Sequence, residues 1–204
     1  MIKKSGADPV QLVEKILQSA KKLFAGKGYH GASMRDIARE AECSQSMVSH
    51  HFGSKSELWN RIKSDSFDHY IQQICNSSFV CTKKNFEHTM SVFIDKRMAY
   101  LNSEPDMVRM ITWQSLEGPE DGENSKIDKF MQKFVSDIRE AQLRDELRED
   151  IAPELIAFFL LFATRAWFQD KACWVLKALG KSDEEGLKEY TVALKKLLKN
   201  GIFL

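Results

Sequence analysis

Two adjacent histidines are the side chains of this sequence that most directly suggest chemistry. His50 and His51 lie within the stretch CSQSMVSHHFGSKSELW, which covers residues 43–59. Successive residues of a helix point about 100° apart because the helix has about 3.6 residues per turn, so neighbouring imidazoles do not converge on one metal ion. No Cys, Asp or Glu lies three or four residues from either histidine. A metal site is therefore not expected here.

Motifs of catalysis elsewhere in the chain are incomplete. Gly180-Lys181-Ser182 looks like the end of a phosphate-binding loop, but Val175 stands where that loop needs its first glycine. No nucleophile-elbow or zinc-protease pattern occurs. The cysteines lack the spacing of metal ligands, which predicts reduced thiols in a cytoplasmic protein. They are Cys43, Cys75, Cys81 and Cys173. The sequence thus predicts neither an enzyme nor a cofactor.

The short polar helix around the histidines suits a second kind of chemistry, the recognition of base edges. Ser44 is a good N-cap, and after it only Val48 is plainly apolar. Short hydrogen-bonding side chains at the start of a helix can reach bases in the major groove, and an exposed helix N-terminus can receive a phosphate. The alternative interpretation is a plain solvated helix face. The side chains concerned are Gln45, Ser46, Met47, Ser49 and His50.

Charge is placed unevenly along the chain. The formal net charge is only +1, but residues 1–63 hold 11 Lys and Arg against 6 Asp and Glu, whereas residues 64–204 hold 19 against 23. A basic N-terminal third favours a polyanionic partner such as DNA. The most apolar run, 155–163, is too short to span a bilayer, so no membrane partner is expected.

Turn and cap signals divide the chain into helices, and no strand pattern appears. A first helix begins at Pro9 and stops at Gly28, and capping signatures at Ser33, Ser44 and Ser54 begin the next three. Two short helices joined by a tight turn, with a bracing helix on each side, predict a helix-turn-helix. Further helices are expected at about 85–102, 105–117, 125–147, 153–178 and 183–200, with loops near 76–84 and 118–124.

One set of residues between positions 10 and 60 keeps the internal spacing of a known family. The set is Ile16, Leu17, Ala20, Leu23, Phe24, Gly28, Tyr29, Ser33, Met34, Arg35, Asp36, Ile37, Ala38, Ala41, Ser44, Val48, His51, Phe52, Lys55 and Leu58. With these residues the sequence resembles the tetracycline-repressor (TetR-type) family of bacterial transcription regulators. Beyond residue 60 only the helical layout and the total length agree with that family.

The resemblance implies three groups of DNA-facing positions. The start of the second helix reaches the backbone or nearby bases, the start of the recognition helix reads bases, and two later positions contact phosphates. In that order, the positions are Ser33, Met34 and Arg35; Gln45, Ser46 and Met47; and His51 and Lys55. Ser44, Ser49 and His50 complete the predicted DNA-binding set.

Two positions depart from the family pattern. Ser49 stands where the family usually has an aromatic residue, most often Tyr, that lies against the DNA backbone. Glu42 stands where the turn usually has Gly, and a left-handed residue with a side chain costs on the order of 1 kcal/mol. We therefore expect a changed backbone contact at Ser49 and a turn at Glu42 that is either strained or differently shaped.

The segment 155–163 is apolar around the full turn of a helix, so it requires cover on nearly all sides. One face buried in its own domain and another in a second copy would meet this requirement, and the last helix, 183–200, would complete the interface. The resemblance implies the same homodimer, a four-helix bundle of the last two long helices. Its two recognition helices would read half-sites of palindromic double-stranded DNA roughly 34 Å apart.

The resemblance also implies a small-molecule effector in the larger domain, and the side chains there favour an apolar or aromatic one. The alternative for each candidate is a place in the core. Arg165, like Asp95, has apolar neighbours and either orients a ligand or pairs with a charge on another helix. The candidates are Met90, Phe93, Met107, Met110, Trp113, Phe130, Phe134, Phe159, Phe162, Arg165 and Trp167.

The sequence therefore predicts an all-α, ligand-responsive transcriptional repressor. Residues 1–53 form its helix-turn-helix DNA-binding domain. Residues 54–204, beginning with a long helix near residue 54, form a larger helical domain for ligand binding and dimerisation. The alternative is a helical small-molecule-binding or enzymatic protein whose N-terminal unit mediates protein contacts instead of DNA binding.

Overall fold

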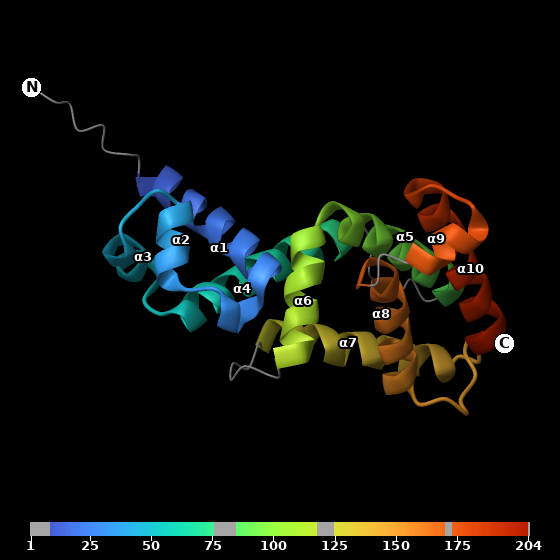
Figure 1. Cartoon of the computed structure of the whole chain (residues 1–204). Helices are drawn as coiled ribbons and strands as arrows, with labels where there is room; N and C mark the ends of the chain where they lie inside the picture. Colours follow the sequence, from blue (N-terminus) through green and yellow to red (C-terminus); the bar gives the residue numbers. More distant parts are fainter. Residues whose placement is uncertain (1–8, 76–84, 118–124, 170–172, 204) are drawn as a thin grey trace, which may run out of the picture. The chain divides into compact units, whose positions relative to one another are not determined.

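The computed structural model describes residues 9–75, 85–117, 125–169 and 173–203 (Figure 1). These residues are helical almost throughout, which confirms the all-α class, and their only β-type pairing is an isolated bridge between Leu147 and Phe203. The loops expected at 76–84 and 118–124 lie outside the described residues. The helices are α1 (Pro9–Gly31), α2 (Met34–Glu40), α3 (Gln45–Phe52), α4 (Lys55–Cys75), α5 (Phe86–Ser103), α6 (Pro105–Glu117), α7 (Ser125–Gln142), α8 (Pro153–Gln169), α9 (Cys173–Leu179) and α10 (Asp183–Ile202).

The chain divides into two compact units. Met1–Ser66 and Asp106–Gly122 form the first unit, and Phe67–Pro105 and Glu123–Leu204 form the second. The first unit therefore contains α1, α2, α3, the first half of α4 and most of α6. The second contains α5 and α7 to α10 together with the second half of α4.

The core of the first unit joins α1 to the helix-turn-helix. Ile16, Ala20 and Phe24 recur every four residues, so they form one face of α1, and all three are fully buried. Trp59 of α4 meets Phe24 edge to face, with ring centroids 5.0 Å apart. Ile37 of α2 and Val48 of α3 pack into the same cluster. These contacts fix the two short helices against a long one.

Gly28 interrupts α1, as the sequence predicts, and α6 covers the break. Its φ of 73° is left-handed, and a Cβ at this position would lie 2.9 Å from the ring of Trp113, so only glycine fits. Arg109 Nε and Trp113 Nε1 donate to the carbonyl of Ala25 at 3.0 and 3.2 Å. The side chains of α6 thus satisfy a backbone group that the break leaves without a helical partner.

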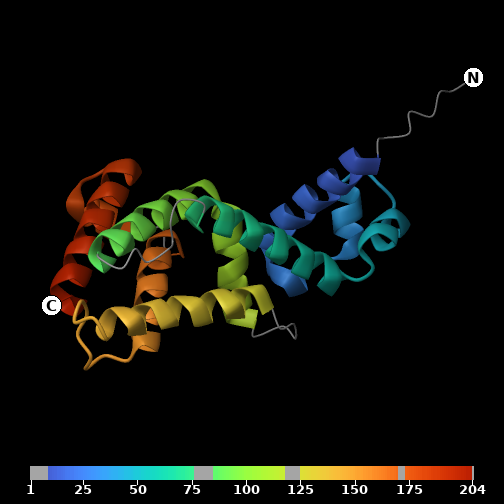
Figure 2. The same cartoon turned by 180° about the vertical axis from the view of Figure 1, so that it is seen from behind.

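The second unit packs α8 against α7, α5 and α10. Figure 2 shows the yellow α7 crossing the orange α8. Phe93 of α5 and Phe134 of α7 are buried with ring centroids 5.3 Å apart. Tyr190 of α10 donates its hydroxyl to the carbonyl of Ala163 at 2.7 Å. One side of α8 is therefore committed to the core of its own unit.

Two predicted helix ends in this unit are wrong. α7 ends at Gln142 instead of residue 147, because Asp145 takes a left-handed φ of 56° and the N–H of Glu146 donates to the carbonyl of Ala141 at 3.1 Å. This closure ends a helix without a glycine. The stretch 153–178 is divided between α8 and α9, with 170–172 outside the described residues.

The hydropathy of the helices bears on membrane insertion. Within the part of the chain that the structure describes, no helix combines the length and the apolar character that crossing a bilayer requires.

Candidate nucleic-acid interface

Side-chain caps begin both helices of the helix-turn-helix. The hydroxyl of Ser33 accepts from the N–H of Asp36 at 3.1 Å, and that of Ser44 accepts from the N–H of Met47 at 3.3 Å. Each cap satisfies one of the N–H groups that a helix start leaves without an intrahelical partner. The caps expected from the sequence at Ser33 and Ser44 are confirmed, and they set the points where α2 and α3 begin.

The turn between α2 and α3 is left-handed at Glu42, with φ 54°. The N–H of Cys43 donates to the carbonyl of Ala38 at 2.9 Å, and that of Glu42 to Arg39 at 3.2 Å. This is the Schellman pattern that a glycine usually ends. The Glu42 carboxylate bonds the ammonium of Lys15 on α1, which holds the pKa of Glu42 below its ordinary value. The side chain that strains the turn therefore also ties it to α1.

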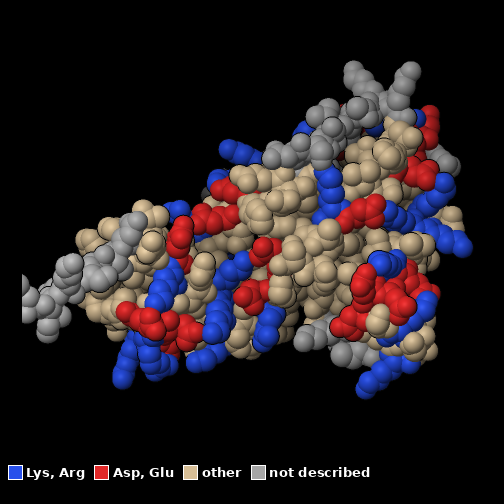
Figure 3. Space-filling model, turned by 90° about the horizontal axis from the view of Figure 1, so that it is seen from above, with Lys and Arg blue, Asp and Glu red and all other residues tan. Residues whose placement is uncertain are grey.

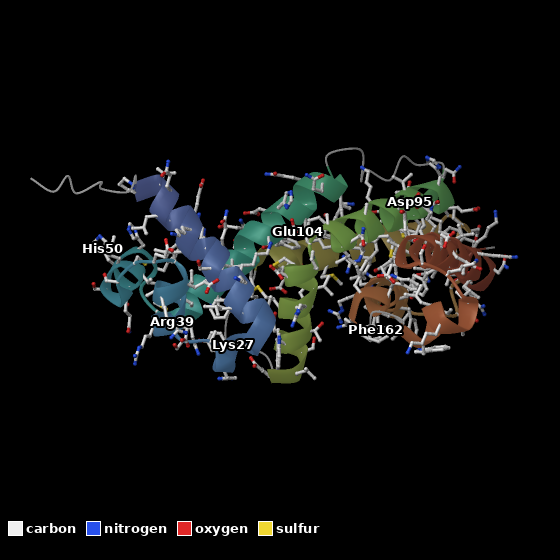
Figure 4. All side chains as sticks on the ribbon, turned by 45° about the horizontal axis from the view of Figure 1, so that its top comes forward. Lys27, Arg39, His50, Asp95, Glu104 and Phe162 are labelled. Atoms are coloured by element: carbon white, nitrogen blue, oxygen red, sulfur yellow. The ribbon has the colours of Figure 1, made fainter. Side chains whose placement is uncertain are left out.

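α3 presents its predicted reading side chains to solvent. Val48 is the one buried residue of this helix, and Met47 is 41% exposed although it is apolar. The hydroxyls of Ser44 and Ser46 lie 2.8 Å apart at the start of the helix. Figure 4 labels His50 on α3. The structure thus brings six predicted residues to the outside of one short helix: Gln45, Ser46, Met47, Ser49, His50 and His51.

The two histidines contact each other edge to face. Their ring centroids lie 5.4 Å apart with an interplanar angle of 71°, and both side chains are exposed. Among the described residues, no three His, Cys, Asp or Glu side chains gather as a metal ion would require. The geometry suits separate contacts made by His50 and His51.

The start of α2 offers fewer exposed side chains than the resemblance implies. Ser33 and Arg35 are exposed, but Met34 is half-buried and packs against the core of the first unit. The Ser33 hydroxyl also donates to a carboxylate oxygen of Asp36 at 2.6 Å. Of these three predicted residues, Arg35 is therefore the one whose charge suits a phosphate best.

Lys55 has an internal role that the sequence did not reveal. Its ammonium donates to the carbonyls of Tyr29 and Ala32 at 3.0 and 3.2 Å and lies 4.2 Å from the Tyr29 ring centroid. A positive charge at the C-terminal end of a helix is favourable, and Tyr29 belongs to the end of α1. Two of the three ammonium donors are used, which leaves one for a phosphate. No local signal pairs residues 26 positions apart.

The start of α4 is closed by the predicted capping box. The N–H of Ser54 donates to Glu57 Oε2 at 2.7 Å, and the N–H of Glu57 donates to Ser54 Oγ at 3.2 Å. Gly53 precedes it with φ 67°, and a Cβ there would lie 2.2 Å from Glu57 Oε2. The Glu57 carboxylate repels a phosphate at this helix end, so the start of α3 is the better anion site.

Acidic side chains neutralise part of the basic surplus of residues 1–63. Figure 3 shows acidic and basic atoms side by side over the visible surface. The carboxylate of Glu40 has its pKa lowered because the ammonium of Lys22 donates a hydrogen bond to it. The charge available to DNA is therefore smaller than the residue counts suggest. The ion pairs are Lys15–Glu42, Lys22–Glu40 and Arg39–Asp36, and Figure 4 labels Arg39.

The residues predicted for an effector site divide between the two units. In the first unit, Met107 and Met110 are buried in the core and Trp113 bonds to α1. The members in the second unit differ in exposure: Met90, Phe93, Phe134 and Trp167 are buried, Phe130 and Arg165 are half-buried, and Phe159 and Phe162 are exposed. A hollow of about 330 Å³ between α5 and α10 is lined by other side chains, among them Asp95, Met98 and Lys195.

Two family models match the chain. The model described as "Bacterial regulatory proteins, tetR family" matches residues 16–62. The model described as "Tetracyclin repressor-like, C-terminal domain" matches residues 91–194, which is more than half of the chain. The matches cover the helix-turn-helix and most of the remaining helices.

Individual relatives are similar over shorter stretches. The chain is 26% identical over 103 residues to the "Probable HTH-type transcriptional regulator YttP" of Bacillus subtilis, which covers 50% of this chain and 49% of YttP. It is 36% identical over 55 residues to the HTH-type transcriptional repressor AcnR of Corynebacterium efficiens, or 27% of this chain and 29% of AcnR. The matched region thus spans about half of YttP and less than a third of AcnR.

Solved structures agree over nearly the whole chain. The ketosteroid transcriptional regulator KstR2 of Mycobacterium tuberculosis superimposes with a TM-score of 0.69, covering 98% of this chain and 98% of KstR2 at 17% identity. At this identity the likeness concerns the fold. It extends from the helix-turn-helix to the last helix.

Proposed function

Because the chain belongs to the tetR family of bacterial regulatory proteins, we propose that it is a transcriptional repressor that binds palindromic DNA as a homodimer and is released by a small effector. Membership of a regulatory family confirms a regulator instead of an enzyme. We assign DNA binding to residues 1–53 and effector binding and dimerisation to residues 54–204. The DNA, the second copy and the effector are each supported by a different observation.

The outer side of α3 carries the proposal of DNA binding. Gln45 and Ser46 stand exposed at the N-terminal end of a capped helix, which is where a recognition helix contacts base edges. Exposed His50 and His51 lie one turn or more further along, within reach of a backbone that the helix start approaches. Arg35 and the remaining donor of Lys55 add contacts to phosphates.

An apolar side of α8 supports the homodimer. Leu155, Phe158, Phe159 and Phe162 are spaced at three and four residues, so they form one stripe, and all four are exposed in the single chain. Figure 4 labels Phe162 on this helix. Exposed aromatic stripes of this kind mark interaction sites. A second copy would cover the stripe with the same residues about a two-fold axis.

The proposed repression and effector rest on the relatives. AcnR is named a repressor, and the name of KstR2 refers to ketosteroids, which are largely apolar molecules. An apolar effector agrees with the aromatic content of the second unit. It must bind one arrangement of the dimer better than the other, because only differential affinity shifts the equilibrium. A repressor acts where the chromosome lies, so we place the protein in the cytoplasm.

Selection of bound sequences from a random DNA pool tests DNA binding, symmetry and spacing together. We expect palindromic sites whose half-sites lie about one helical turn apart. Light scattering at micromolar concentration should give twice the chain mass of 23.5 kDa. Enrichment of no sequence, or a monomer mass with asymmetric sites, would contradict the proposal.

A further inference from the structure

Two arginines of the second unit lie close together, and among the described residues neither has a carboxylate partner. They are Arg97 on α5 and Arg165 on α8. Neither forms an ion pair with any residue that the structure describes. The charge of Arg97 acts on Arg165 and, after burial, is the second cause that lowers the pKa of Arg165. Like charges in the interior of a protein are costly unless an anion joins them.

Neutral groups hold Arg97 in place. Its Nε donates to Thr164 Oγ1 at 2.7 Å, and its Nη1 donates to the hydroxyl of Tyr70 at 2.5 Å. Thr164 is fully buried, and its hydroxyl donates a hydrogen bond to the carbonyl of Leu160 at 2.8 Å. The guanidinium has five N–H donors, so three remain after these two bonds. Arg97 is thus positioned by α4 and α8 but keeps its charge and most of its donors.

Arg165 directly follows the residue that anchors Arg97. Its Nε is buried and has no hydrogen-bond partner among the described residues. A buried donor without a partner costs more than a typical hydrogen bond contributes. In native proteins such groups are uncommon, so Arg165 requires an explanation that packing alone does not give.

Asp95 of α5 and Glu104, which follows that helix, lie beside other side chains. Asp95 pairs with Lys195 at 2.5 Å, and Glu104 lies 3.9 Å from the ring of His69. Figure 4 labels Asp95 on α5 and Glu104 directly after the end of that helix. Of the two alternatives left open for each residue, Asp95 therefore pairs with a charge on another helix, whereas Arg165 forms no ion pair with any residue that the structure describes.

Aromatic rings lie beside the Arg97 guanidinium. The Arg97 guanidinium is 5.3 Å from the ring centroid of Tyr70. Tyr70 in turn contacts Phe130 and Phe67, each with centroids 6.0 Å apart, and Phe130 stacks on Phe134 at 6.0 Å. Two neighbouring cations beside a cluster of aromatic rings suit a molecule with an anionic head and an apolar body.

We propose that Arg97 and Arg165 bind the carboxylate of the effector, and that the effector is an organic acid with an alkyl or aromatic body. This inference rests on the proposed function, since it assigns the chemistry of the molecule that releases the DNA. Planar guanidinium groups hold carboxylates through two parallel N–H···O bonds. Such an anion would offset one of the two positive charges and accept a hydrogen bond from the buried Nε of Arg165. It also narrows the apolar effector predicted from the sequence to an amphipathic acid.

The first test titrates the full chain with matched probes in a calorimeter. Decanoate and 4-phenylbutyrate supply an acid on an alkyl and on an aromatic body, and 1-decanol and acetate supply the body or the head alone. We expect one of the two acids to bind at least about tenfold more tightly than decanol and acetate, because hydrogen bonds to a charged group are worth that factor. Equal binding of decanoate and decanol, or binding of neither acid, would overturn the inference.

The second test compares Arg165→Met with Arg139→Met. Arg139 is an exposed arginine of α7 that already pairs with Glu154 at 2.8 Å. We expect Arg165→Met to reduce acid affinity at least about tenfold while the melting temperature of the free protein stays the same or rises, because a half-buried charge is lost together with a buried Nε that has no partner among the described residues. Arg139→Met should leave acid affinity unchanged. If Arg165 had only a structural role, its replacement would lower the melting temperature and leave the acid affinity unchanged.

Gel shifts on the selected operator separate this inference from the proposed function. If the wild-type protein binds the operator, but no acid binds the protein or releases it from the DNA, the proposed carboxylate site is wrong and the proposed repressor function is unaffected. If an acid binds in the calorimeter but the protein binds no DNA, the proposed repressor function is wrong and the proposed carboxylate site is unaffected. Should Arg165→Met fail to fold, Arg165→Lys keeps the positive charge but loses the planar N–H donors of the guanidinium. It should still weaken acid binding relative to wild type.

Discussion

α3 and α8 each leave one side uncovered by their own unit, and the chemistry of the two sides is opposite. Val48 is the one buried residue of α3, and the exposed residues of that helix are polar apart from Met47. On α8, the uncovered side is the stripe of Leu155, Phe158, Phe159 and Phe162, whose members are between 48% and 57% exposed. The two helices therefore need different partners.

The difference determines how firmly each partner is required. Water satisfies the polar side of α3, so that side gains from DNA only through charge and matched hydrogen bonds. Water does not satisfy the stripe of α8, and fully burying one such side chain stabilises by about 1.5–3 kcal/mol. We expect the α8 contact to persist without DNA and the α3 contact to depend on salt and sequence.

Breaking the α8 stripe should give the largest effect. In Phe158→Glu, each copy of a dimer would lose an apolar contact and place a charge in the interface. We expect the dissociation constant of the dimer to rise by on the order of a thousandfold, because two copies are changed at once. Sedimentation or light scattering across concentrations measures this. DNA affinity should fall with the dimer, since one recognition helix cannot hold two half-sites.

A matched control asks whether the position or only the added charge matters. Leu143 is 81% exposed in the same unit but follows the end of α7 and is not part of the α8 stripe. Leu143→Glu should leave the dimer intact. If both variants dissociate alike, the α8 stripe is not the interface.

Lys55 tests whether the α3 side depends on support from α1. Lys55→Ala removes two charge-assisted hydrogen bonds, to the carbonyl of Tyr29 in α1 and to that of Ala32 just after it, so we expect the free energy of unfolding to fall by about 1–3 kcal/mol. It should also weaken binding to every DNA sequence and flatten the salt dependence by about one unit of slope. Thermal melts and gel shifts at several salt concentrations measure the two effects. An unchanged slope with a lower melting temperature would limit Lys55 to its internal role.

Gln45 tests base reading by the exposed side of α3. Gln45→Ala should leave the fold unchanged, because the side chain is exposed. It should reduce affinity for the preferred operator roughly tenfold and relax the choice of base at one position of each half-site. Repeating the random-pool selection with the variant reveals the change. A uniform loss on all sequences would show that Gln45 contacts only the backbone.

The sequence predicted the first unit well because its signals are local. Caps at Ser33, Ser44 and Ser54 and the glycine break at Gly28 each depend on residues within a few positions, and the structure confirms them. At Glu42 the sequence allowed a strained or a differently shaped turn, and the structure shows the left-handed one. The ion pair of Glu42 with Lys15, 27 residues away, was not predicted. The role of Lys55 was missed for the same reason. Contacts between distant residues leave no periodic trace in one sequence.

The second unit was predicted less well because apolar residues there serve several purposes. Met, Phe and Trp at helical spacing indicate burial, but they do not say whether the burial is in the core, in an interface or around a ligand. Phe93 proved to be core and Phe162 exposed, although their sequence contexts are alike. The early helix end at Gln142 was missed because Asp145 replaces the usual glycine signal. The effector-site residues and the DNA contacts remain predictions.

Glu42 should show the smallest effect, because its ion pair with Lys15 is exposed. The pair lowers the pKa of Glu42 in the folded state, so its contribution to stability is present at neutral pH and is lost as the pH falls below the ordinary glutamate value of about 4.3. Glu42→Gln should therefore melt slightly lower than wild type at pH 7, the difference should shrink as the pH falls through the lowered pKa of Glu42, and high salt should also reduce it. Glu14→Gln, on the exposed side of α1, controls for the lost charge and should show neither trend. Because the left-handed backbone is the same in Glu42→Gln, operator affinity should not change; a large loss would mean that the tie to α1, and not the turn itself, sets the position of α3.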